Sequence, residues 1–249
     1  MSTFHVDVLE SDIRVRFTPP LVSGTLLKRY KRFLADVRLD DGREITAHCM
    51  NPGSMKGLIE PGTQVWLTPH DDPKRKLQWT WQIAHEGATA VGVNTNLPNA
   101  LIAAAAEAGV LEPLSGYATY RREVRYGAER SRIDLLAEGH PSDPRPCYVE
   151  IKSVTLAVDT VAMFPDAVTK RGLKHLRELE RMKGEGARAM MVYLVQRTDC
   201  QRFAPAAHID PDYAEGVRSA KAKGVEFYAW TAQVKPDGIL LAQPLPTEA

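Results

Sequence analysis

Two short apolar segments in the middle of the chain carry charged residues at spacings that could support chemistry. One segment contains Asp134, and the other contains Glu150 and Lys152. Side chains at positions i and i+2 of a strand share one face, so Glu150 and Lys152 should project together. If the Asp134 segment forms a neighbouring strand, two carboxylates and one ammonium meet at one site.

Carboxylates from two strands favour a hard divalent cation such as Mg²⁺ or Mn²⁺, because such ions prefer oxygen ligands and retain bound water. A lysine beside the cation can orient or deprotonate a water molecule, or offset the negative charge that develops on a phosphate. The pattern therefore predicts a phosphodiester-cleaving site. Asp134 and Glu150 would be its metal ligands, and all three side chains, including Lys152, would be catalytic.

The same Glu-x-Lys spacing also occurs in exposed edge strands, where it serves only a salt bridge to the next strand. The neighbouring residues argue against an exposed edge, because Tyr148, Val149, Ile151 and Val154 are apolar. A glutamate and a lysine buried in that setting need partners or a metal. Both interpretations stay open, and the apolar context favours the catalytic one.

Length and composition are those of a soluble globular protein. The chain has 249 residues, of which 44% are hydrophobic and 25% charged, enough for one large or two ordinary domains. We find neither an apolar run of membrane-spanning length nor a signal-peptide pattern, so we expect a cytoplasmic protein without a membrane partner. Three separated cysteines and scattered histidines favour neither a disulfide framework nor a zinc site.

The net charge of +1 provides no overall attraction for phosphates, so nucleic-acid binding would depend on local clusters. Two basic clusters are interleaved with or followed by aromatic residues, a pattern that suits single-stranded nucleic acid. The alternative is a solvated basic turn whose aromatic residues face the core of a small barrel. The candidate contacts in these clusters are Lys28, Arg29, Tyr30, Lys31, Arg32, Lys74, Arg75 and Lys76.

Residues 1–86 have the pattern of a small β-barrel of the OB-fold type. Alternating segments are separated by turn signals, and Asp40-Asp41-Gly42 is typical of a hairpin. The predicted strands cover residues 14–17, 33–39, 43–49, 63–67 and 77–84. A polar, glycine-rich loop at residues 51–57 interrupts them, and it is either a phosphate-binding loop or a plain connection.

Residues 87–249 have the pattern of an α/β domain with a mixed sheet and at least one βαβ crossover. The helix at residues 169–183 is amphipathic: an apolar stripe lies opposite Lys170, Arg171 and Lys174. The predicted helices are at residues 99–109, 169–183 and 211–223, and the predicted strands at 120–126, 132–136, 148–153, 189–195 and 225–230.

An Asp-bearing strand, a Glu-x-Lys strand, a crossover helix and an apolar strand, in this order, resemble the PD-(D/E)xK nuclease fold. Over nearly its whole length the chain also resembles the sugar fermentation stimulation protein (SfsA) family. The matching segments are LLKRYKRFLADV at 26–37, AHC at 47–49, NPGSM at 51–55, SRIDLL at 131–136, YVEIKSVTL at 148–156 and FPDAVT at 164–169. The resemblance implies a nucleic-acid-binding protein, with DNA (single strands included) or RNA as partner, and a link to the regulation of sugar use.

If the chain is a nuclease, further residues would belong to its site. The backbone carbonyl of Ile151 would complete the metal shell, while Lys170, Arg171 and Lys174 would grip phosphates near the cut. Gln196, which follows the apolar strand, would reach the same rim.

Two departures from the nuclease pattern leave catalysis open. Nucleases of this fold often add a glutamate from the preceding helix, but Ala104 occupies that position here and Glu107 lies one turn further on. The usual proline before the metal-binding aspartate is replaced by Ile133. The chain is therefore either a Mg²⁺- or Mn²⁺-dependent nuclease or a non-catalytic DNA-binding transcriptional regulator that retains the nuclease fold.

Overall fold

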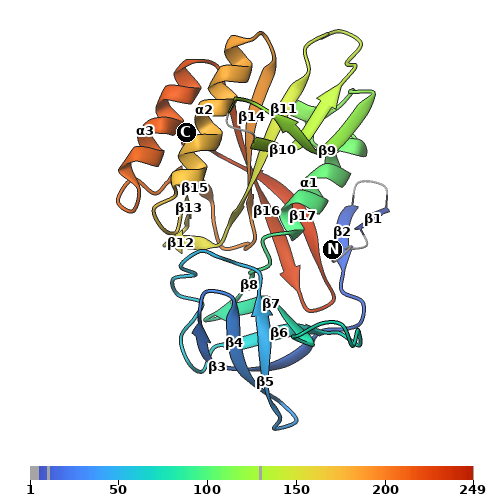
Figure 1. Cartoon of the computed structure of the whole chain (residues 1–249), viewed down its shortest axis with the longest axis vertical. Coiled ribbons are helices and arrows are strands. Elements are labelled where there is room, and N and C mark those ends of the chain that lie inside the picture. Colours follow the sequence, from blue (N-terminus) through green and yellow to red (C-terminus); the bar gives the residue numbers. More distant parts are fainter. Residues whose placement is uncertain (1–5, 10–11, 129–130, 249) are drawn as a thin grey trace.

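The computed structural model describes residues 6–9, 12–128 and 131–248. A β-barrel forms one end of the molecule and an α/β domain forms the other (Figure 1). Within the described residues, no helix has the length and apolar character needed to cross a membrane.

The barrel contains five strands that close on themselves. The sheet order is β5-β4-β3-β6-β7, and a parallel pairing of β5 with β7 closes the ring, while β8 extends it. Leu26, Val37, Leu67 and Trp81 are fully buried inside it. The strands are β3 (Val22–Tyr30), β4 (Leu34–Leu39), β5 (Glu44–Cys49), β6 (Gln64–Pro69), β7 (Trp79–Glu86) and β8 (Thr89–Gly92). The predicted OB-type barrel is confirmed.

The first two strands do not belong to this barrel. Strands β1 (Val6–Leu9) and β2 (Asp12–Arg16) form a hairpin, and β2 pairs with β17 (Gly238–Leu245) in the sheet of the other domain. Ile13 and Val15 are buried in that domain's core. Our assignment of residues 14–17 to the barrel was therefore wrong, because alternation predicts a strand but not the sheet that it joins. The barrel strands run from residue 22 to residue 92, rather than over 1–86.

The α/β domain is built on an eight-stranded mixed sheet in the order β1-β2-β17-β16-β14-β11-β10-β9. Strands β11, β14 and β16 are parallel, and the other neighbours are antiparallel. Helices α2 and α3 cover one face and α1 the other (Figure 1). The bounds are α1 Leu97–Glu107, β9 Thr119–Tyr126, β10 Ser131–Glu138, β11 Cys147–Val154, α2 Lys170–Gly184, β14 Arg188–Val195, α3 Pro211–Ala222 and β16 Glu226–Lys235.

Helix α2 forms the predicted crossover between the parallel strands β11 and β14. It begins after Thr169, whose side-chain oxygen accepts a hydrogen bond from Gly172 N at 3.0 Å. Leu176, Leu179 and Met182 are buried against the sheet. The N-terminal turn of α2 lies at the same cavity as β11. A short 3₁₀ helix (Glu112–Leu114) and a small sheet of β12 (Leu156–Val158), β13 (Val161–Phe164) and β15 (Arg202–Pro205) complete the domain.

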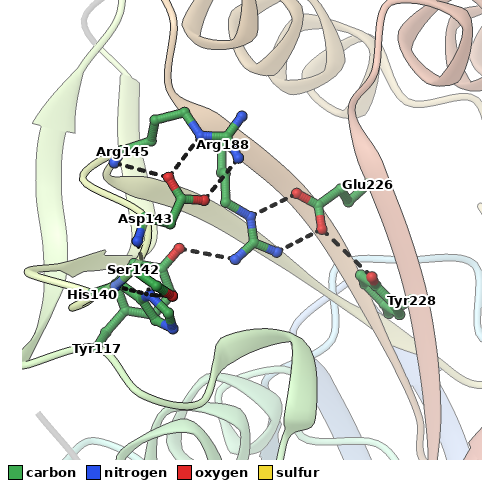
Figure 2. Close-up of polar contacts among 8 residues, drawn as sticks. All are labelled: Tyr117, His140, Ser142, Asp143, Arg145, Arg188, Glu226 and Tyr228. Carbon is green, nitrogen blue, oxygen red and sulfur yellow. Dashed lines mark hydrogen bonds and ion pairs between the residues drawn. The ribbon is translucent and has the colours of Figure 1, made fainter.

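A polar cluster lies where the parallel strands β11, β14 and β16 begin (Figure 2). The cavity lies at the other end of β11. Arg188 donates to both carboxylate oxygens of Glu226 at 2.9 and 2.7 Å, and to the Tyr117 hydroxyl at 2.9 Å. Bidentate pairing of this kind is geometrically specific. The cluster therefore holds β14 and β16 in register beside the first residues of β11.

Candidate metal and nucleic-acid site

Asp134 is held between β11 and α1. One carboxylate oxygen accepts a hydrogen bond from Ile151 N at 2.7 Å, and the other accepts one from Asn99 Nδ2 at 2.8 Å. The pairing of β10 with β11 begins at Leu135, and at Ile151 the Asp134 side chain accepts the hydrogen bond from the backbone amide. The carboxylate therefore has a fixed orientation beside the Glu-x-Lys segment.

Glu150, Lys152 and His175 form a compact buried group. Glu150 Oε1 accepts a hydrogen bond from Lys152 Nζ at 2.6 Å and a short one from His175 Nδ1 of helix α2. His175 Nδ1 contacts the Glu150 carboxylate, which only accepts, and His175 Nε2 lies 3.4 Å from Arg171 Nε, which only donates, so we assign the imidazole proton to Nδ1. Lys152 Nζ lies 3.0 Å from the same Nδ1, and it donates to Glu150 Oε1 rather than to the ring. Glu150 Oε2 is buried and has no hydrogen-bond partner among the described residues.

The electrostatics of the two carboxylates differ. Burial raises the pKa of Asp134 to about 7, and the negative charge of Glu150 adds to this effect. Burial also acts to raise the pKa of Glu150, but the Lys152 ammonium and the His175 hydrogen bond outweigh it and hold that pKa below its usual value. Burial lowers the pKa of His175, which favours the neutral imidazole. A cation between the two carboxylates would relieve their repulsion.

The oxygen atoms present fit a partly hydrated divalent cation. Glu150 Oε2, the Asp134 carboxylate and the Ile151 carbonyl are hard donors of the kind that Mg²⁺ and Mn²⁺ prefer. Within the described part of the chain, no group of three or more His, Cys, Asp and Glu side chains could hold a metal by itself. Mg²⁺ commonly binds through one or two carboxylates, several waters and substrate phosphate, so the donor set fits such an ion.

These groups face a cavity of about 450 Å³ that both domains line. Asp134, Glu150 and Lys152 belong to its α/β side, together with Asn99 of α1 and the first turn of α2. The barrel contributes Arg32, Asn51, Pro52 and Gly53. The predicted site residues therefore lie where the two domains meet.

The barrel loop that contains residues 51–55 is fixed to the α/β domain. Ser54 Oγ donates to the Asp166 carbonyl at 2.7 Å, and Met55 N donates to Asp166 Oδ2 at 2.8 Å. Gly53 N donates to Asn51 Oδ1 at 2.8 Å. Because these amides are already engaged, the loop is a wall of the cavity and not a phosphate cradle built on them.

Arg29 belongs to the support of this loop. Its guanidinium donates to the carbonyls of Asn51 and Gly53 at 2.8 and 3.0 Å. Of the other residues predicted in this cluster, Lys28 pairs with Asp36 at 3.3 Å, and the Tyr30 hydroxyl donates to the same carboxylate at 3.1 Å.

One residue from each of two predicted basic segments reaches the cavity. Arg32 of the barrel and Arg171 of α2 both line it. Lys31, Lys74, Lys76 and Lys170 are exposed but do not line it; Arg75 and Lys174 are half-buried and also lie outside it. Arg75 instead donates to Thr80 Oγ1 at 3.1 Å within the barrel.

The two accessory candidates occupy other positions. Glu107 is exposed at the C-terminal end of α1 and does not line the cavity; Asn99, in the first turn of the same helix, contacts Asp134 instead. Gln196 is fully buried and does not line the cavity. It donates to the hydroxyl of Ser153, which does line the cavity, at 2.9 Å.

Glu123, His175 and Asn99 were missed by the sequence-based predictions. Glu123 lies on β9, lines the cavity and has a φ of 55°, an unusual conformation for a non-glycine residue. No sequence signal predicts that conformation. For His175 a signal existed, since it lies four residues before Leu179 and seven before Met182, on the buried stripe of α2.

Comparison with known proteins gives consistent results over the chain. The model of the SfsA N-terminal OB domain matches residues 27–93, and that of the sugar fermentation stimulation protein RE domain matches residues 96–238. A sugar fermentation stimulation protein homologue from a Ruegeria species is 53% identical over 94% of this chain and 100% of its own length. The homologue from Paramagnetospirillum magneticum is also 53% identical, over 93% of this chain and 97% of its own length. The structure of Pyrococcus furiosus SfsA in complex with Ca²⁺ superposes with a TM-score of 0.85 at 28% identity, covering 94% of this chain and 98% of that one. The chain belongs to the sugar fermentation stimulation protein (SfsA) family.

Proposed function

We propose that this protein binds nucleic acid and cleaves phosphodiester bonds with a divalent cation held at Asp134 and Glu150. The observation that carries the proposal is the buried, unpartnered Oε2 of Glu150, next to an Oε1 fixed by two donors. Leaving a buried acceptor unpaired costs about 1–3 kcal/mol, and more for a charged group. A divalent cation bound to Glu150 Oε2 in the active protein would account for this arrangement.

Each residue has a distinct role in this proposal. Asp134, Glu150 and the Ile151 carbonyl would hold Mg²⁺ or Mn²⁺, which supplies Lewis-acid stabilisation and lowers the pKa of a bound water. Lys152 places its ammonium at the same cavity, where it can stabilise negative charge on the phosphate. His175 orients Glu150 by its Nδ1 hydrogen bond.

A relative supports the cation component. The Pyrococcus furiosus protein was solved with Ca²⁺, and it shares the fold over nearly its full length. Ca²⁺ and Mg²⁺ are both hard cations that prefer oxygen ligands, although they differ in size and coordination number. We therefore expect a divalent-cation site in this chain too.

The second candidate is a non-catalytic, DNA-binding transcriptional regulator connected with sugar utilisation. It is favoured by helix α1, which supplies no carboxylate to the site: Ala104 replaces the usual glutamate and Glu107 is distant. The residue of α1 that contacts Asp134 is instead an amide, Asn99. A regulator would bind nucleic acid without turnover.

One experiment separates the two candidates. Labelled single- and double-stranded DNA and RNA are incubated with wild type and with Lys152→Ala, in Mg²⁺, Mn²⁺ or EDTA. The nuclease proposal predicts cleavage by wild type in Mg²⁺ or Mn²⁺, none in EDTA, and none by the variant. Binding without cleavage under every condition would establish the regulator instead.

A further inference from the structure

We propose that the substrate enters this cavity as a single unpaired nucleic-acid strand, and that Phe33, which follows the cavity-lining Arg32 on the barrel, is the platform on which a base stacks. This inference rests on the proposed function, and it adds the strandedness of the substrate and a residue that selects it.

The first argument is the enclosure of the site. Barrel residues 51–53 and the α/β residues Asp134 and Glu150 line the same cavity, and Asp166 ties the barrel loop in place. Its volume of about 450 Å³ is that of a small-ligand pocket. A volume of this size accommodates one nucleotide of a flexible strand, whereas a base-paired duplex does not fit inside it.

The second argument is depth. The Glu150 side chain is 3% exposed and that of Lys152 is 13% exposed, so a phosphate must enter the cavity to reach them. Phosphates on a duplex are held at a fixed radius on its outer surface. An unpaired strand can bend into the cavity because its bases are free to unstack and turn outward.

The third argument is the charge on both walls. Arg32 from the barrel and Arg171 from α2 line the cavity. Arg32 Nη2 donates to the Pro52 carbonyl at 3.0 Å, and Arg171 Nε lies 3.4 Å from His175 Nε2. Each contact orients a guanidinium through one of its five N–H donors, and the remaining donors suit phosphate oxygens.

The fourth argument is the presentation of Phe33. Its side chain is 45% exposed, although phenylalanine usually buries its ring. It directly follows Lys31 and Arg32, whose φ angles of 48° and 64° are unfavourable for residues with a Cβ atom. The Phe33 carbonyl accepts a hydrogen bond from Cys49 N at 2.9 Å, which fixes the backbone. The Arg32 guanidinium lies over this ring, with Cζ 6.0 Å from its centroid, so a base stacked on the exposed part of Phe33 would lie beside a cavity-lining arginine.

The test measures binding by fluorescence anisotropy in EDTA, so that no cleavage occurs. The probes are a labelled single-stranded oligodeoxynucleotide and a blunt hairpin duplex of matched length. The proteins are wild type, Phe33→Leu, Phe33→Trp and the control Val158→Ala, which truncates an equally exposed apolar side chain (47%) on β12 outside the cavity.

We expect the single strand to bind at least tenfold more tightly than the duplex. Phe33→Leu should weaken single-strand binding about tenfold, as expected for loss of one stacked base, and should leave duplex binding unchanged. Phe33→Trp should restore wild-type affinity, and Val158→Ala should have no effect. Equal or tighter duplex binding, or an equal loss for both probes in Phe33→Leu, would overturn this inference and leave the proposed function standing. Failure of wild type to bind either probe would overturn this inference, and the cleavage experiment with DNA and RNA in Mg²⁺ or Mn²⁺ would then decide the proposed function separately.

Discussion

The Asp134→Asn substitution should separate two effects of the Asp134 carboxylate: its buried charge destabilises the fold, and the same charge binds a cation. The substitution removes a negative charge and preserves the shape of the side chain. The Ile151 amide can still donate to the side-chain oxygen of asparagine. Asn99 can rotate its amide and accept from the new Nδ2, so both hydrogen bonds are retained.

The expected magnitude follows from the pKa of Asp134. The folded protein raises that pKa from 3.8 to about 7, so between these values the folded state holds a proton that the unfolded state has lost. The free energy of unfolding of wild type therefore decreases as pH rises through this window. At about 1.4 kcal/mol per pKa unit, the loss reaches roughly 4 kcal/mol by pH 8. The asparagine variant lacks this pH-dependent loss.

The assay is urea denaturation of both proteins at pH 5 and pH 8 in EDTA. The variant should be more stable than wild type at pH 8, and the difference should shrink by roughly 3 kcal/mol toward pH 5, because two pKa units of the shift lie in this range. Saturating Mn²⁺ at pH 8 should then stabilise wild type, by about 2.7 kcal/mol at 100 times the dissociation constant, and should hardly affect the variant. If the difference in the free energy of unfolding between the two proteins is the same at pH 5 and at pH 8, the electrostatic reasoning is refuted.

Four further predictions concern residues at the site and in the barrel segment beside it. Lys152→Ala should abolish cleavage and leave oligonucleotide affinity nearly unchanged in single-turnover and titration experiments. A parallel loss of oligonucleotide binding would contradict its role in stabilising the transition state. His175→Leu should lower Mn²⁺ affinity about tenfold by calorimetry, while His175→Asn, which can still donate to Glu150, should retain it; equal losses in the two variants would point to a packing role alone. Arg32→Ala should weaken single-strand binding and lower the log–log salt slope by about 0.7, without a change in melting temperature. Arg29→Ala should instead lower the melting temperature, because its guanidinium supports the loop at residues 51–55; the reverse pattern would exchange the roles of the two arginines.

Local patterns in the sequence predicted much of the fold. Alternation and turn residues predicted four of the five strands that close the barrel, β4, β5, β6 and β7, but missed β3 (Val22–Tyr30). The crossover helix followed from its apolar stripe. The placement of β2 was mispredicted, because its partner strand β17 lies more than 200 residues away and leaves no mark on the local pattern.

The site was predictable to the extent that it depends on strand periodicity. Glu150 and Lys152 are two residues apart on one strand, and they contact each other. The donors that orient the carboxylates, Asn99 and His175, come from helices on opposite faces of the sheet. The docking of Asp166 with the barrel loop depends on the meeting of two domains, which no spacing in the sequence encodes.

The most direct test of the central claim is anomalous diffraction from crystals soaked in Mn²⁺. The claim is that Asp134 and Glu150 share one divalent cation at the unpartnered Oε2 of Glu150. We predict a single strong anomalous peak about 2.0–2.3 Å from that oxygen and from an Asp134 carboxylate oxygen. A peak elsewhere on the protein, or none between these carboxylates at saturating Mn²⁺, would contradict it.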